Sequence, residues 1–189
     1  MIEIRRNKEE FSKRLTEVAQ VYQAAFAGPP WKEQLPLEEA VKRIEVHAVE
    51  EGFDALLAYE PPNKIVGSLW YEDLNVDALE EKKGSDLAKF TSEVQKQGLE
   101  RVIYTLDTVV DPAYQGRGIA SSLKDQYIKE IDTTSPNGAV VLTRHRDDNT
   151  GIIRTSEKQG FLRTRIRMPS SQNPKTAHEY WYKVFPPKP

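Results

Sequence analysis

The sequence of 189 residues contains no cysteine. Without cysteine there is no disulfide, no thiolate nucleophile and no zinc site built on cysteine ligands. An excess of charge of one sign is also missing, because 27 Lys and Arg stand against 29 Asp and Glu, a formal net charge of −2. This balance gives no reason to expect nucleic acid or an anionic membrane as the partner.

Long apolar runs are missing as well. No run of the sequence approaches the roughly 18 residues that a membrane span needs, and Met1 to Arg6 does not have the pattern of a signal peptide. We therefore expect a cytoplasmic protein. The length predicts a single domain over residues 1–189 with an ample core, and the proline-rich residues 186–189 are interpreted as a frayed tail.

The most informative stretch covers residues 101–131. Residues 101–110 are rich in β-branched and apolar side chains, which predicts a buried strand that Asp111-Pro112 ends. After Gly116 and Gly118, apolar residues recur at helical spacing. The sequence therefore predicts a strand, a glycine-rich turn and a helix. The helical positions are Ala120, Leu123, Tyr127 and Ile131, with Ile119 and Ile128 on the flanks.

The predicted turn has the properties of an anion site. Gly116 and Gly118 allow a sharp bend, so that several N–H groups point outward at the positive end of the following helix, where phosphate binds well. The glycine spacing alone is equally typical of a turn that binds nothing. Two nucleotide motifs are excluded, because the turn lacks a Gly-Lys-Ser/Thr ending and has Ser121 where a dinucleotide fingerprint needs its third glycine.

Two motifs carry a resemblance to a known family. Residues 115–120, Gln-Gly-Arg-Gly-Ile-Ala, resemble the Gln/Arg-x-x-Gly-x-Gly/Ala signature of the GNAT superfamily of N-acetyltransferases, and Val110-Asp111-Pro112 precedes them as in that family. Residues 149–161 look like the second family motif, an Asn-led helix closed by Gly160-Phe161. The resemblance extends diffusely over residues 2–185. It implies an α/β (α+β) fold, a mixed central sheet of about six to seven strands flanked by helices.

The remaining patterns agree with that layout. Residues 71–98 are longer than a hairpin turn and are interpreted as a helical insertion, with Ser85 as the candidate cap and Gly98 as the stop. His47 lies at the edge of an apolar helix face and is interpreted as structural rather than catalytic. One helix is predicted to follow an Asn7/Glu10 capping box, with its apolar face over residues 11–26, and to end at Gly28. The other predicted elements are strand 2–5, helix 37–48, hairpin 53–70, strand 139–143, charged loop 144–148, and strands 161–168 and 179–185.

The resemblance implies acetyl-CoA as cosubstrate and no metal. The pyrophosphate would bind the N–H groups of residues 116–121, and the pantetheine arm would pair with the main chain of residues 108–110, where one N–H polarises the thioester carbonyl. Asn149 would bond to a pantetheine amide, or act as a helix cap, or both. The implied cofactor residues are Thr108, Val109, Val110, Gln115, Gly116, Arg117, Gly118, Ile119, Ala120, Ser121 and Asn149.

The catalytic residues are less clear, because the chain departs from the family here. Many members have a tyrosine as general acid four residues before the Gly-Phe, and this chain has Ser156, a poorer proton donor. The loss is tolerable, since a thiol leaves largely as thiolate without help and acid catalysis contributes only about 10²–10⁴-fold. No glutamate ends the preceding strand, where some members have one.

Several residues are candidates for the general base. Asp107 and His145 are predicted near the expected cleft, as are Glu72 and Asp73 at the end of the third strand. A histidine exchanges protons near neutral pH, which favours His145, although a solvated loop is the simpler interpretation of residues 144–146. Asp107 has the alternative of capping a neighbouring turn, and a water chain could replace any of these groups.

The sequence thus predicts an N-acetyltransferase that moves acetyl by direct transfer to a primary amine of a small molecule or a protein. Ser156 also leaves open a non-catalytic acyl-CoA-binding module, and a transferase of longer acyl groups is a third reading. The acceptor cannot be read, because its surface is expected from the Trp31 region and residues 71–98 and 169–177, which carry no motif. The sequence leaves a monomer and a homodimer open.

Overall fold

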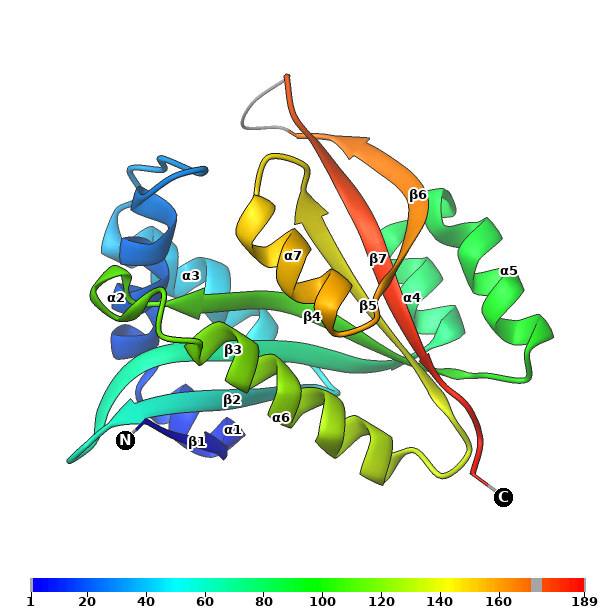
Figure 1. Cartoon of the computed structure of the whole chain (residues 1–189), viewed down its shortest axis with the longest axis horizontal. Coiled ribbons are helices and arrows are strands. Elements are labelled where there is room, and N and C mark those ends of the chain that lie inside the picture. Colours follow the sequence, from blue (N-terminus) through cyan, green and yellow to red (C-terminus); the bar gives the residue numbers. More distant parts are fainter. Residues whose placement is uncertain (1, 171–174, 189) are drawn as a thin grey trace. The chain divides into compact units, whose positions relative to one another are not determined.

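The computed structural model describes residues 2–170 and 175–188. Its seven strands form one sheet in the order β1-β2-β3-β4-β5-β7-β6 (Figure 1). Strands β4 and β5 are parallel, with Val102 opposite Val140 and Tyr104 opposite Leu142, whereas β5–β7 and β6–β7 are antiparallel. The strands are β1 (Glu3–Arg6), β2 (Phe53–Glu60), β3 (Lys64–Asn75), β4 (Arg101–Val110), β5 (Ala139–Arg146), β6 (Leu162–Pro169) and β7 (Ala177–Phe185).

The helices follow the predicted order with some additions. They are α1 (Lys8–Lys13), α2 (Leu15–Ala27), α3 (Leu37–Ala48), α4 (Val76–Lys83), η1 (Ser85–Leu87), α5 (Ala88–Lys96), η2 (Pro112–Tyr114), α6 (Ile119–Thr134) and α7 (Thr150–Lys158). The chain divides into two compact units, which we call the first unit (residues 2–72 and 106–128) and the second unit (residues 73–105 and 129–188). The mixed sheet with flanking helices confirms the predicted fold class.

In the first unit, helices cover both faces of β3. The Trp70 ring lies 5.5 Å from Phe11 of α1 and 6.0 Å from Tyr22 of α2, between ring centroids. The next residue, Tyr71, lies 4.9 Å from Tyr127 of α6. Because successive side chains of a strand point to opposite faces, α1 and α2 pack on one face of β3 and α6 packs on the other.

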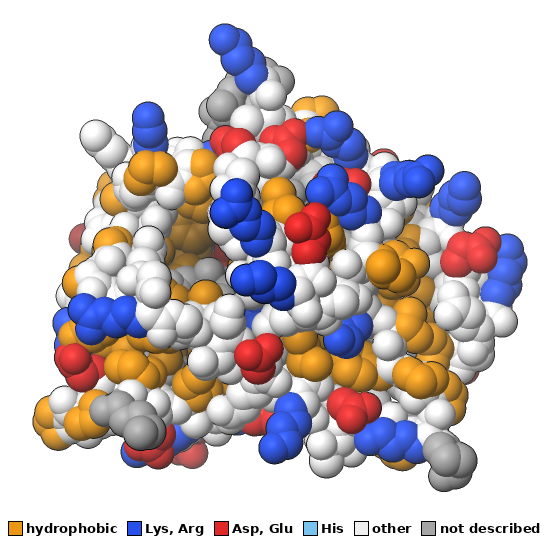
Figure 2. All heavy atoms as spheres, viewed as in Figure 1, with side chains coloured by type: hydrophobic (Ala, Val, Ile, Leu, Met, Phe, Trp, Pro, Cys, Tyr) orange, Lys and Arg blue, Asp and Glu red, His pale blue; other side chains and the backbone are white. Residues whose placement is uncertain are grey.

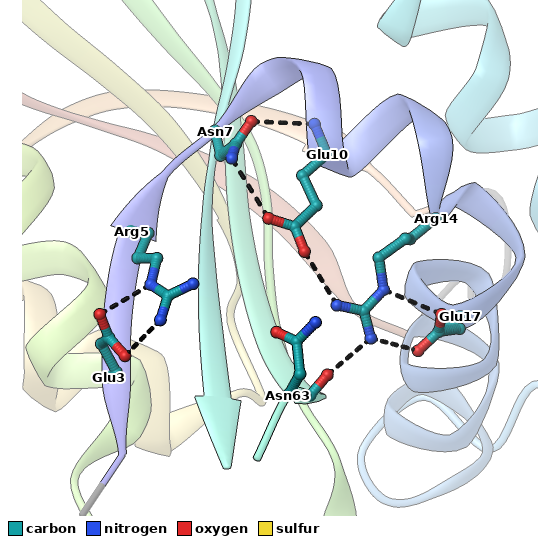
Figure 3. Close-up of polar contacts among 7 residues, drawn as sticks. All are labelled: Glu3, Arg5, Asn7, Glu10, Arg14, Glu17 and Asn63. Carbon is teal, nitrogen blue, oxygen red and sulfur yellow. Dashed lines mark hydrogen bonds and ion pairs between the residues drawn. The ribbon is translucent and has the colours of Figure 1, made fainter. Parts of the chain in front are cut away.

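Polar contacts near the amino terminus shape the first helices (Figure 3). Asn7 Oδ1 accepts a hydrogen bond from Glu10 N at 2.9 Å, which confirms the predicted cap. At Arg14 the backbone leaves the helical region (φ −111°, ψ 30°), so the prediction of one continuous helix is wrong and α1 and α2 take its place. The Arg14 guanidinium contacts Glu10, Glu17 and the Asn63 carbonyl, which ties this break to the β2–β3 turn.

The insertion begins later than predicted. Strand β3 runs on to Asn75, and Tyr71 and Glu72 still pair with Asp54 and Phe53 of β2. Asn75 then caps α4 by accepting from Ala78 N at 2.7 Å. The predicted cap at Ser85 is wrong, since Ser85 lies in η1 and makes no capping side-chain bond to α5.

Two predictions fail in the second unit. Strand β5 continues through Arg146, which pairs with His178 of β7, so residues 144–146 are strand and not a charged loop. The tail prediction is wrong for residues 186–188, because Lys188 N donates to the Pro136 carbonyl at 2.8 Å; residue 189 lies outside the described residues.

Candidate functional site

The glycine-rich turn has the open geometry that the sequence predicts. Gly116 and Gly118 have φ values of +74° and +79°, which side-chain-bearing residues rarely adopt, and a Cβ at either position would meet no atom within 4 Å. Ser122 N donates to the Gly118 carbonyl at 2.9 Å, so the helical bonding of α6 starts there. The residues just before Ser122 thus lie in the first turn of a helix of 16 residues, at its positive end.

Neighbouring contacts hold this turn in place. Gln115 Nε2 donates to the Val110 carbonyl at 3.1 Å, and the Arg117 guanidinium donates to the Ala113 carbonyl at 3.0 Å. The Tyr114 hydroxyl donates to Glu60 at the end of β2. Both backbone and side chains therefore fix the bend from β4 into α6.

Gly67 of β3 is a site residue that sequence reasoning missed. A Cβ here would lie 3.0 Å from the Val109 carbonyl oxygen and 3.4 Å from a methyl group of Ile119. Asp111 N donates to the Val66 carbonyl at 2.9 Å nearby. Gly67 thus allows β3 to approach the end of β4 and the start of α6 closely. A single glycine inside a strand pattern is the signal that could have indicated it.

Residues 108–110 form the end of β4. Val109 and Val110 are 2% and 7% exposed, so their side chains are in the core, while Thr108 is half-buried. Because the Val109 and Val110 side chains are taken up by packing, these two residues can serve a ligand only through their main-chain groups, as the resemblance implies.

Asn149 lies at the start of α7 in the second unit. Its Oδ1 accepts from Ile152 N at 3.5 Å, which confirms the alternative of a helix cap. Any bond from its side-chain N–H₂ to a ligand stays a prediction.

The structure brings His145 and Ser156 together. His145 Nε2 lies 2.7 Å from Ser156 Oγ, and the two residues are 5% and 0% exposed. The His145 ring also lies 5.8 Å from the Trp181 ring. His145 is therefore a buried strand residue bonded to α7, and its interpretation as a solvated loop residue is wrong.

Asp107 lies in the first unit, in the wall of a cavity of about 280 Å³. Burial, first, and the nearby Asp107 carboxylate raise the pKa of Tyr22 in the same wall, although a hydrogen bond with Arg43 opposes this shift. Asp107 therefore faces a cavity shared with α2 and α3.

The two other candidates for the base have partners. Glu72 is 2% exposed, and its Oε1 lies 3.3 Å from His47 Nδ1. Asp73 makes an ion pair with Arg101, with an Oδ2–Nη2 distance of 2.6 Å. Asp73 is thus engaged in a structural contact, and His47 has a buried carboxylate beside it that the sequence did not reveal.

A sequence model of the acetyltransferase (GNAT) family matches residues 16–161. The chain belongs to the GNAT acetyltransferase family. This family match confirms the resemblance drawn from the two motifs, both of which lie inside the matched range. A search of curated protein sequences found no match.

Solved structures share the GNAT fold with this chain. The ribosomal-protein-S18-alanine N-acetyltransferase from Escherichia coli superposes with a TM-score of 0.68 at 15% identity, over 98% of this chain and 95% of that one. NAA60 from Arabidopsis thaliana in complex with acetyl-CoA gives 0.65 at 14% identity, over 97% and 98%. A GNAT acetyltransferase from Streptococcus pneumoniae gives 0.63 at 14% identity, over 98% and 99%. At these identities the likeness shows the fold.

Among residues 2–170 and 175–188, no helix is long and apolar enough to cross a membrane. The same residues contain no group of three or more His, Asp or Glu side chains placed to hold a metal ion. Figure 2 shows basic and acidic side chains interspersed over the visible face, in keeping with the small net charge.

Proposed function

We propose that this GNAT protein transfers acetyl from acetyl-CoA to a primary amine of a small molecule or protein. The observation that carries the proposal is the turn at Gly116 and Gly118, where two glycines of positive φ and an uncrowded Cβ position precede the first turn of α6. Main-chain N–H groups at such a turn bind a pyrophosphate without depending on side-chain identity. The turn therefore fits the phosphates of the cosubstrate.

The second part of the proposal concerns the acyl end. The main chain of residues 108–110 would pair with the pantetheine arm, and one of its N–H groups would stabilise the oxyanion that forms when the amine attacks. Gly67 supports this, because a Cβ at this position would lie only 3.0 Å from the Val109 carbonyl oxygen, so the missing side chain lets β3 approach this segment closely. A rigid donor at the reacting carbonyl is usually worth more than a general acid.

The reaction also needs proton transfer. An ammonium group must lose a proton before its nitrogen attacks; the C–N bond then forms, the C–S bond breaks, and the second nitrogen proton leaves to restore a neutral amide and thiol. We assign removal of the first proton to Asp107, which faces a cavity. We assign delivery of a proton to the thiolate to His145, whose partner Ser156 takes the position of the family tyrosine. Each of these groups could also act through water.

One observation favours a second function. Ser156 is fully buried and bonded to His145, and a buried serine is a weak substitute for a tyrosine acid. A non-catalytic acyl-CoA-binding module of the same fold is therefore the alternative. An assay with acetyl-CoA and a panel of primary amines, followed by thiol release and by product mass, separates the two functions. A cytoplasmic location is also part of the proposal.

A further inference from the structure

The first unit contains a cavity that no sequence motif predicts. Its volume is about 280 Å³, and three of its wall residues, Tyr22, Ile44 and Trp70, are at most 7% exposed. Arg43 and His47 have side chains that are 41% and 36% exposed, and Val46 is 57% exposed, so these three residues stand at the opening. The seventh wall residue is Asp107 of β4. The cavity thus combines an aromatic and aliphatic interior with a carboxylate.

The charges around the cavity favour a cation. The Arg43 guanidinium is offset by two carboxylates, with Glu33 at 3.2 Å and Glu39 at 2.9 Å. Glu72, 2% exposed, stands beside His47 at 3.3 Å. Because these two carboxylates balance the charge of Arg43, the negative charges of Asp107 and Glu72 exceed any positive charge on His47. An anionic guest would be repelled, and an ammonium group would gain a charge-assisted contact with Asp107.

The interior has a further unused group. The indole nitrogen of Trp70 is buried and has no hydrogen-bond partner among the described residues. A buried donor without a partner costs about 1–3 kcal/mol, so such groups in native proteins call for an explanation. A polar guest, or the water it brings, would offer this donor an acceptor.

The position of Asp107 links the cavity to the proposed chemistry. Asp107 directly precedes Thr108, and consecutive Cα atoms are about 3.8 Å apart. A nitrogen bound at Asp107 would therefore lie close to the main-chain segment to which the thioester carbonyl is assigned. This step rests on the proposed function.

We propose that this cavity is the acceptor site, and that it selects compact primary amines in their ammonium form, with Asp107 binding the ammonium group and Tyr22, Ile44 and Trp70 packing against the body of the molecule. Amines that carry a carboxylate or phosphate next to the nitrogen are poor acceptors in this account, because Glu72 and Asp107 repel them.

Calorimetric titration of the full chain tests the site without any transfer. The probes are tyramine and its uncharged analogue tyrosol, in which a hydroxyl replaces the amine. The wild type should bind tyramine at least about tenfold more tightly than tyrosol at low salt. Asp107→Asn, which keeps the shape and removes the charge, should abolish that difference. Glu45→Gln, which removes an exposed carboxylate of α3 outside the cavity wall, should keep it. Equal losses for both probes in Asp107→Asn would overturn the proposal.

A second pair of variants does not depend on Asp107. Val46→Lys places an ammonium group at the opening, so it should weaken the binding of tyramine by about tenfold and leave the binding of tyrosol unchanged. Val46→Gln is its uncharged control. Unchanged tyramine binding in Val46→Lys would contradict the site. A thermal shift with acetyl-CoA, run in parallel, separates the two proposals: tyramine selectivity without acetyl-CoA binding contradicts the transferase, and acetyl-CoA binding without tyramine selectivity contradicts the cavity.

Discussion

His145 Nε2 of β5 lies 2.7 Å from Ser156 Oγ of α7, and both side chains are buried. In the proposed function, Ser156 is therefore bonded to the histidine that we assign to proton delivery. Buried hydrogen bonds of this kind fix the orientation of an imidazole ring, which is a precondition for its use in proton transfer.

Ser156→Ala should reduce kcat/KM by about tenfold or less, because the main-chain oxyanion contact and the positioning of the thioester do not depend on the hydroxyl. It should lower the free energy of unfolding by about 1–3 kcal/mol, since a buried His145 nitrogen loses this partner. Initial rates and urea unfolding measure the two effects. Ser156→Thr, which keeps a hydroxyl, is the control, and complete loss of activity in Ser156→Ala alone would show a direct role for the serine.

Acetyl-CoA and CoA should both stabilise the folded protein. A ligand present at about 100 times its dissociation constant adds roughly 2.7 kcal/mol to the free energy of unfolding. Thermal melting at millimolar ligand tests this expectation, with adenosine as a control that lacks the pyrophosphate. No rise in melting temperature with either ligand would count against the assignment of the turn as a phosphate site.

Gly118→Val should abolish cosubstrate binding, because a branched side chain would block approach to the N–H groups of the turn. The φ of +79° adds backbone strain, so the variant should also lose about 1–3 kcal/mol of stability. Gly98→Val is the matched control, since Gly98 has a φ of +71° and an equally open Cβ position but lies after α5. Calorimetry should find normal acetyl-CoA affinity in the control; wild-type affinity in folded Gly118→Val would exclude the turn.

Lys124 of α6 should make stability depend on pH. Burial lowers the pKa of this lysine to about 7, and Asp125 opposes that shift only in part. Between about pH 7 and pH 10 the unfolded chain binds more protons than the folded one, so this group destabilises the fold increasingly as pH falls through that window. Lys124→Met should be more stable than the wild type at pH 7, and its advantage should shrink by pH 9.5 in urea unfolding. An advantage that is the same at both pH values would contradict the shift.

Local signals predicted the centre of the fold well. The strand over residues 101–110 has the predicted bounds, and Leu123, Tyr127 and Ile131 are buried in α6 as their spacing indicates. The Asn7 cap and the turn glycines were also readable, because each depends on a few neighbouring residues.

Contacts between distant residues could not be read. The bond between His145 and Ser156 depends on β5 continuing beside β7, and the charged residues 144–148 conceal that continuation. The pairing of His47 with Glu72 joins α3 to β3 across 25 positions, and the burial of Lys124 contradicts the usual preference of lysine for solvent. Tertiary packing determines these two contacts and the burial of Lys124, so residue propensity and motif spacing could not predict them.

The most direct test of the account is transfer itself. The wild-type chain is incubated with acetyl-CoA and a panel of primary amines that includes tyramine, and CoA thiol and acetylated product are quantified together by thiol titration and mass spectrometry. The account predicts equal amounts of free thiol and N-acetylated amine with at least one acceptor. Acetyl-CoA binding without acetylation of any amine in the panel would contradict it and would leave the acyl-CoA-binding module as the function.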